Sequence, residues 1–221
     1  MQIFDQLIAM KDGGLLMIPI LVCLVFAMAI AFERLFYVIF RANINATAFM
    51  AQIQKQIMAN RIDTAINLCN AEPHAALPQV VKAALTRANR TEREIENAVE
   101  EATLAVAPRI NKRTPYLAML ANISTLLGLL GTIWGLIMAF QAVATAPPEM
   151  KQTMLAAGIS VAMYTTAAGL MVAIPTLLIH SIISNRSNKI LDDVDQYGMK
   201  VVNLLTARRR GTLSEDAAAN K

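Results

Sequence analysis

A set of hydroxyl side chains lies within long apolar stretches of the sequence, where a polar group is costly and therefore informative. The set comprises Thr125, Thr132, Ser160, Tyr164, Thr165 and Thr166. A hydroxyl in an apolar helix usually donates to the carbonyl one turn earlier, which is a structural role. Thr125 and Thr132 are seven residues apart and share a helix face. The alternative is therefore a set that faces a common interior and provides a polar path for protons or ions.

Residue types used by enzymes and metal sites are sparse. The chain has two histidines, His74 and His180, and two cysteines, Cys23 and Cys69. None has a neighbour at metal-ligand spacing, no Ser/His/Asp set can be assembled, and no glycine-rich loop precedes a lysine. The sequence therefore predicts no catalytic residue, no cofactor and no metal site. A hydrolytic membrane enzyme is the weakest hypothesis, and both cysteines are interpreted as packing residues.

Glycines accompany the hydroxyls in the same two apolar stretches. They are Gly128, Gly131, Gly135, Gly158 and Gly169. Gly131 and Gly135 form a GxxxG pair, which lets two membrane helices approach closely. The glycines predict tight packing between the two stretches or between copies of the chain.

The elements that hold these residues are defined by where charge is missing. Hydrophobic residues make up 56% of the 221-residue chain and charged residues only 16%, against about 25% in soluble domains. No charged residue occurs in residues 13–32, 114–148 or 152–185. Each gap can cross a hydrocarbon core of ~30 Å as a helix, and no strand pattern appears. The predicted fold class is an all-α membrane protein with three transmembrane helices, the second and third extending into the cytoplasm.

Orientation follows from the placement of lysine and arginine. Of the 20 basic residues, eleven lie in residues 33–113 and seven in residues 184–221, whereas Lys11 and Lys151 stand alone. Basic residues accumulate on the cytoplasmic side, so the N-terminus is predicted outside and the C-terminus inside. This asymmetry accounts for the net charge of +4 and argues against nucleic-acid binding. The arginines 208–210 are expected near anionic lipid headgroups of the bilayer or in solution.

These patterns divide the sequence into segments with different surroundings. In order, they are a periplasmic interfacial helix (1–13), a first transmembrane helix (14–40), a cytoplasmic helical domain (41–113), a second transmembrane helix (114–146), a periplasmic hairpin (147–152), a third transmembrane helix (153–184) and a cytoplasmic C-terminal helix and tail (185–221).

One helix of the cytoplasmic domain has a clear start signal. Thr91 and Glu94 have the spacing of a capping box, and apolar residues then recur at helical spacing. The opposite face carries Glu92, Glu96, Glu100 and Glu101. This acidic face is either simply solvated or a docking surface for a cytoplasmic partner.

Three stretches resemble the membrane signatures of the MotA/TolQ/ExbB proton-channel family. They are GGLLMIPILVCLVFAMAIAFERL, PYLAMLANISTLLGLLGTIWGLIMAF and LAAGISVAMYTTAAGLMVAIP, which begin at residues 13, 115 and 155. The spacing is also similar, with a long insertion between the first and second helices. The resemblance is closest to ExbB/TolQ-type subunits, because MotA-type subunits have four membrane helices.

The resemblance implies a function and a set of partners. It implies a homo-pentamer in the bacterial inner membrane around the single membrane helix of an ExbD/TolR-like partner, whose Asp binds and releases protons. A TonB-like or TolA-like protein would receive the work. Thr132 in GLLGTIWG and Thr166 in TTAAGL match the family's pore-facing threonines, and Ser160 and Tyr164, one turn apart, would help to order water.

One position departs from the family pattern. Val161 stands where many ExbB/TolQ members have a Glu, and no Asp, Glu, Lys or Arg lies within the second or third apolar stretch. A hydroxyl does not ionise near neutral pH, so a titratable group would have to come from the partner. The departure leaves room for a motor subunit of a gliding-motility or other trans-envelope system. A separate alternative is a non-conducting membrane scaffold, in which the glycine faces only hold partners together.

Overall fold

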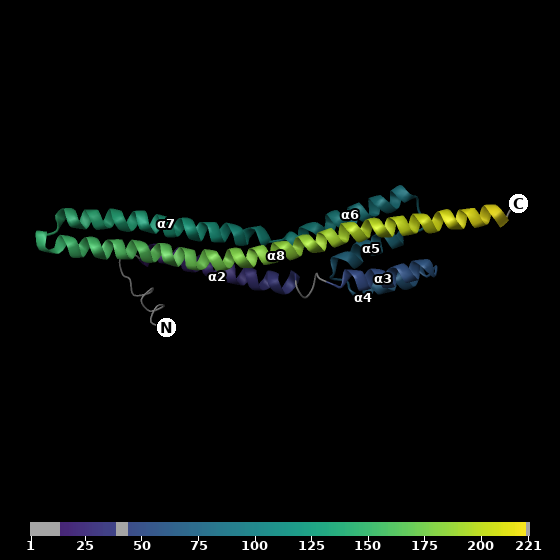
Figure 1. Ribbon diagram of the computed structural model, residues 1–221, viewed down its shortest axis with the longest axis horizontal. Helices are drawn as coiled ribbons and strands as arrows, with labels where there is room; N and C mark the ends of the chain where they lie inside the picture. Colours follow the sequence, from purple (N-terminus) through teal and green to yellow (C-terminus); the bar gives the residue numbers. More distant parts are fainter. Residues whose placement is uncertain (1–13, 39–43, 220–221) are drawn as a thin grey trace. The chain divides into compact units, whose positions relative to one another are not determined.

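The computed structural model describes residues 14–38 and 44–219 of the chain, and these residues form helices and no strands (Figure 1). The all-α prediction is therefore confirmed for the described residues, whereas the predicted interfacial helix at 1–13 lies outside them. The helices are α2 (Gly14–Phe36), α3 (Ala46–Met58), α4 (Ile62–Ala71), α5 (Ala76–Thr86), α6 (Glu92–Asn111), α7 (Thr114–Thr145) and α8 (Pro148–Ala219).

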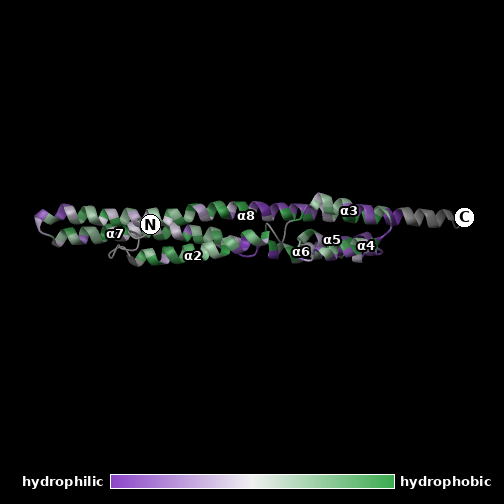
Figure 2. Cartoon of the chain, turned by 90° about the horizontal axis from the view of Figure 1, so that it is seen from below, coloured by the Kyte–Doolittle hydropathy of each residue, from purple (hydrophilic) through white to green (hydrophobic). Residues whose placement is uncertain are grey.

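The described chain divides into two compact units, and the first contains the apolar helices. It comprises α2 up to Arg34, all of α7, and α8 as far as Ile182. Figure 2 shows hydrophobic residues concentrated along α2, α7 and the first half of α8. Helices that are long and apolar enough to cross a bilayer include Leu16–Phe36, with a mean hydropathy of 2.5, and Pro148–Arg210, with 1.9. The chain is therefore a membrane protein.

The surface of the first unit carries large apolar side chains. Phe32 is 75% exposed, Met163 67% and Leu126 63%. Patches of this kind are rare on soluble monomers, because water would drive them together. In this unit they are suited to contact with lipid or with other membrane helices.

The second unit contains α3 to α6 and the remainder of α8, which begins at Ile183 in this unit. Its core is made of aliphatic side chains that are less than 2% exposed, among them Ile53, Val80, Leu85, Ile95 and Leu205. Their spacing on α3, α5, α6 and α8 follows the helical period, so each helix buries one face. Cys69 on α4 is also buried, and burial raises the pKa of its thiol to about 11.

Two helices of the second unit begin at side-chain caps. The predicted capping box is confirmed, since the Thr91 backbone N–H donates to the Glu94 carboxylate at 2.9 Å and the Glu94 N–H to the Thr91 hydroxyl at 3.4 Å. The Asn45 side chain accepts a hydrogen bond from the Ala48 N–H at 3.1 Å and caps α3. These bonds satisfy N–H groups that a helix start leaves without a partner.

Arginines 208–210 contact neighbouring helices of the second unit. Their side chains donate, in order, to the Asn60 side chain, the Arg90 carbonyl and the Glu92 carboxylate. The sequence predicted lipid headgroups or solvent for this run. Within the described unit, the three guanidinium groups contact the α3–α4 turn and the start of α6, while the Arg210 side chain is still 75% exposed.

Candidate functional site: the α7–α8 hairpin

The α7–α8 hairpin is a contact between small residues, and it includes every glycine predicted to pack. A Cβ atom added to Gly131 would lie 2.4 Å from the Thr165 hydroxyl oxygen, and one added to Gly169 would lie 2.6 Å from the Ser124 carbonyl oxygen. Both distances are far below van der Waals contact, so only glycine permits this separation of the helices. The other glycines in the contact are Gly128, Gly135 and Gly158.

The small-residue contact is longer than the glycine pattern suggested. Ser124, Ala139 and Ala162 are buried in it, at 0%, 3% and 3% exposure. A sequence signal for this extension existed, because α7 carries a small residue at almost every turn from Ala121 to Ala139.

Four of the predicted hydroxyls donate to backbone carbonyls. Thr166 donates to Gly128 O across the hairpin at 3.0 Å, and Thr132 donates to Leu129 O on its own helix at 2.6 Å. Thr165 and Thr125 likewise donate to the carbonyls of Ala162 and Ala121. The structural role assigned by default is thus present for all four, and Thr166 adds a link between the helices.

The remaining two hydroxyls, Ser160 and Tyr164, are exposed on α8. Tyr164 is 49% exposed, and neither side chain has a hydrogen-bond partner among the described residues. With about 100° between successive residues of a helix, Tyr164 lies roughly 200° around α8 from Thr166. The structure therefore does not place Ser160 and Tyr164 on the same side of the hairpin as Thr166.

The hairpin has two edges of different chemistry. Thr125 and Thr132 share one edge of α7, and Thr166 joins them through its bond to Gly128 O. Trp134 is two residues beyond Thr132 and so points to nearly the opposite side of α7. We call the edge formed by Thr125, Thr132 and Thr166 the hydroxyl edge.

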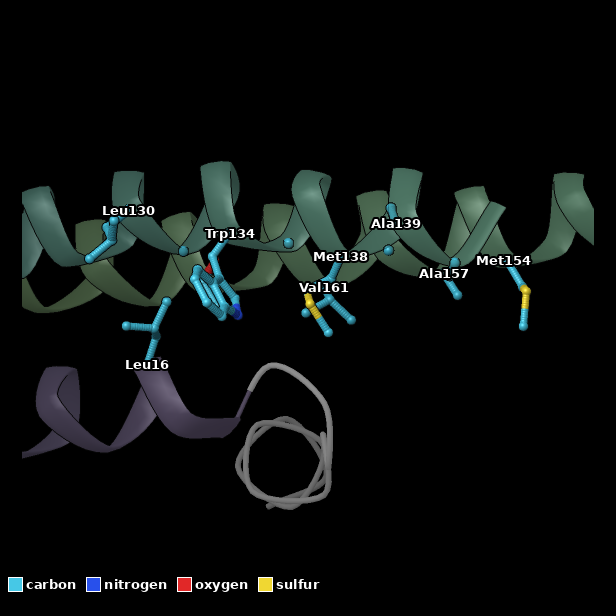
Figure 3. Close-up of a pocket in the computed structure, with 13 residues that line it drawn as sticks. Leu16, Leu130, Trp134, Met138, Ala139, Met154, Ala157 and Val161 are labelled. Carbon is cyan, nitrogen blue, oxygen red and sulfur yellow. The ribbon is translucent and has the colours of Figure 1, made fainter. Parts of the chain in front are cut away.

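The opposite side of the hairpin is an apolar groove of about 540 Å³ that also includes Leu16 of α2. Figure 3 shows Trp134 directed from α7 toward Leu16, with Met138 and Val161 farther along the groove. Thr165 is its only hydroxyl-bearing residue, and its hydroxyl donates to a carbonyl. A carboxylate at position 161 would enter these apolar surroundings at a high desolvation cost, so valine fits the groove in this chain.

The first unit also contains an ion pair that the sequence analysis did not predict. The Arg113 guanidinium donates to the Glu33 carboxylate and connects the end of α2 to the start of α7. Arg113 has a φ of 63° and ends the turn between α6 and α7. The sequence does contain an indication of this ion pair, because Glu33 directly follows one apolar stretch and Arg113 directly precedes the next.

Side chains that ionise near neutral pH are absent from the apolar parts of the hairpin. Residues 114–148 and 152–179 contain no Asp, Glu, Lys, Arg or His. Within the part of the chain that the structure describes, no group of three or more His, Cys, Asp or Glu side chains lies close enough to hold a metal ion. The hairpin can offer hydroxyls and carbonyls to a permeating species, but no side chain that exchanges protons near neutral pH.

Comparison with known proteins gives consistent matches. The profile of the MotA/TolQ/ExbB proton channel family matches residues 52–196. The chain is 29% identical over 169 residues to the Vibrio cholerae biopolymer transport protein exbB1, covering 74% of this chain and 72% of that protein. It is 39% identical over 88 residues to the Tol-Pal system protein TolQ of Haemophilus influenzae, covering 40% of this chain but only 38% of TolQ.

A solved structure has a similar fold. The structure of C. jejuni MotAB aligns with a TM-score of 0.64, covering 91% of this chain and 79% of that chain. The sequence identity is 17%, so the likeness concerns the fold alone.

Proposed function

The chain belongs to the MotA/TolQ/ExbB proton channel family, and we propose that it is an ExbB/TolQ-like channel subunit that couples the proton motive force to work across the cell envelope. The observation that carries the proposal is the hydroxyl edge. Three threonines lie along one side of a hairpin whose apolar parts contain no Asp, Glu, Lys, Arg or His. Such an edge can solvate a proton carrier but cannot replace it.

The proposed partner is the protein that would supply the proton-binding group. Proton transfer near neutral pH needs a group that ionises there, and α7 and the apolar part of α8 contain no Asp, Glu, Lys, Arg or His. We propose an ExbD/TolR-like protein whose single membrane helix brings an Asp to the hydroxyl edge, near Thr132 and Thr166. This division agrees with Val161, since a second carboxylate would have no polar surroundings in the apolar groove.

The proposed assembly follows the family pattern. A homo-pentamer in the bacterial inner membrane would surround the partner, with the N-terminus of each chain outside and its C-terminus inside. The excess of lysine and arginine between the first two apolar helices and after the third supports this orientation. A TonB-like or TolA-like protein would then receive the work.

Removal of one hydroxyl tests the proposal. In Thr132→Val the shape is kept and the hydroxyl is lost, and a loss of about 1.4 kcal/mol of stabilisation corresponds to a roughly tenfold lower rate of proton flow. The measurement is proton uptake by vesicles that hold the chain together with the small membrane proteins that copurify with it. Thr145→Val is the matched control, because Thr145 makes the same kind of bond to its own helix. Equal flow in both variants would contradict the proposal.

A membrane scaffold without conduction is the second candidate, and one observation favours it. All four threonines of the set already donate to carbonyls, as they would in a purely structural hairpin. The scaffold predicts a stable complex that lacks any protein with an Asp in a single membrane helix. Mass spectrometry of the purified complex separates the two candidates.

A further inference from the structure

The second unit has an acidic groove between α6 and α8. It has a volume of about 540 Å³ and is bordered by the carboxylates of Glu96, Glu100 and Asp195. Two apolar side chains in it are largely exposed, Leu104 at 68% and Met199 at 58%. Exposed apolar groups surrounded by charges are typical of a surface that contacts another protein.

The same unit has a basic groove where α3 begins beside α8. Its volume is about 270 Å³, and it is lined by Arg186, Lys189 and Asp193 together with residues 44–47. The start of α3 contributes the partial positive charge of a helix N-terminus. With two cationic side chains against one carboxylate, this groove attracts anionic groups.

The charged side chains of both grooves form no ion pair among the residues that the structure describes. The ion pairs in the described residues join Arg87 to Glu101, Arg113 to Glu33 and Arg210 to Glu92. None involves Glu96, Glu100 or Asp195, and none involves Arg186 or Lys189. Two complementary surfaces are thus present on one unit, and neither satisfies the other.

The two grooves lie on different sides of α8. Asp195 is nine residues beyond Arg186 and six beyond Lys189, which correspond to rotations of roughly 180° and 120° around the helix. The same steps are about 14 Å and 9 Å along the axis. The long side chains of arginine, lysine and glutamate can span much of this distance along the axis. When two surfaces of opposite charge lie on opposite sides of one chain, the acidic surface of one copy can contact the basic surface of the next, which is a head-to-tail contact.

We propose that the side chains lining the acidic groove of one copy contact those lining the basic groove of the next copy. Glu96 and Glu100 then face Arg186 and Lys189 of the neighbour. Leu104 and Met199 supply the apolar part of the contact. The inference identifies the contact between second units in the proposed assembly, and it rests on the proposed function only for the presence of several copies. Repetition of a head-to-tail contact closes into a ring when the rotation allows it.

Disulfide cross-linking between copies tests this contact. A tagged chain with Glu100→Cys is produced together with a differently tagged chain with Lys189→Cys, and the purified complex is oxidised. The native Cys23 and Cys69 are buried and do not compete. We expect a readily detected dimer with both tags, in a yield limited by random mixing of the two chains within each complex, and Glu96→Cys with Arg186→Cys serves as a second pair.

The control replaces Glu100→Cys by Glu72→Cys, an exposed position outside both grooves. It should give at least tenfold less dimer. An intact oligomer without the specific dimer in either pair overturns the contact and leaves the proposed channel standing. A chain that remains monomeric at every concentration contradicts the proposed assembly itself, so the two failures are distinguishable.

Charge reversal provides an independent measurement. Glu100→Lys and Lys189→Glu are each expected to weaken association of the copies about tenfold, and the double variant to recover most of it, because the reversed charges attract each other again. Glu72→Lys and Lys55→Glu are matched exposed controls. Weakening without recovery indicates lipid headgroups or another protein as the partner of these charges, and it overturns the proposal.

Discussion

The two units of this chain differ in the side chains that form their interiors. The α7–α8 hairpin closes around glycine, alanine and serine, with helix backbones in contact. The second unit closes around leucine, isoleucine and valine. Burial of aliphatic groups releases water and stabilises a unit in water, but lipid is as apolar as leucine and offers no such gain. Membrane helices therefore depend on close approach, which large side chains would prevent.

The largest effect that the comparison predicts comes from an aliphatic core residue of the second unit. Leu85 is 1% exposed, so Leu85→Ala leaves a cavity and should lower the free energy of unfolding by about 3 kcal/mol. Leu126→Ala in the hairpin is the contrast, since Leu126 is 63% exposed and loses only lipid-like contacts. Denaturant unfolding in detergent measures both. Equal losses of unfolding free energy in the two variants would contradict the proposed difference between the two units.

Replacement of a small residue by a larger one should destabilise the protein mainly in the hairpin. In Gly169→Ala the new Cβ meets the Ser124 carbonyl oxygen at 2.6 Å, and backbone cannot move aside. We expect a loss of about 2 kcal/mol from overpacking, measured as a lower thermal midpoint in detergent. In Gly198→Ala the nearest atom is a Val99 methyl group at 3.0 Å. That methyl group can shift, and alanine favours the helix, so this variant should remain near the wild-type midpoint.

The smallest effect concerns pH and separates the charged surface of the second unit from the uncharged hairpin. The Thr91 hydroxyl and backbone N–H hold the pKa of Glu94 below its usual value of 4.5. The folded pKa is thus depressed, and its stabilisation is complete above pH 4.5 and is lost as pH falls through the folded pKa. The midpoints of wild type and Glu94→Gln should therefore differ at pH 7 and converge once the pH has fallen below the folded pKa of Glu94. A constant difference would contradict this assignment.

Local patterns predicted the elements well. The three apolar helices follow from gaps in charge, and the capping box of Thr91 and Glu94 follows from two residues three positions apart. Both signals lie within a few turns of the chain. By contrast, Glu33 and Arg113 are 80 positions apart, and no periodicity relates two such residues. Their pairing depends on how separate helices meet.

The candidate site was predictable as a set of residues but not as an arrangement. Sequence patterns selected the threonines and the glycines, because polar and small residues stand out in apolar helices. They did not separate Ser160 and Tyr164 from Thr166, since that requires knowledge of which side of α8 contacts α7. They also missed the cross-helix bond, in which a hydroxyl on α8 meets a carbonyl on α7.

That bond has a consequence for the polarity of the hydroxyl edge. Thr132 and Thr166 each use their only hydroxyl hydrogen on a backbone carbonyl, so they turn lone pairs, and no donors, toward whatever reaches the edge. A carboxylic acid in its protonated form can donate to such a surface, whereas a carboxylate meets only acceptors. An acid brought to this edge would therefore be favoured in its neutral form, and the proposed carrier would keep its proton until it moved away.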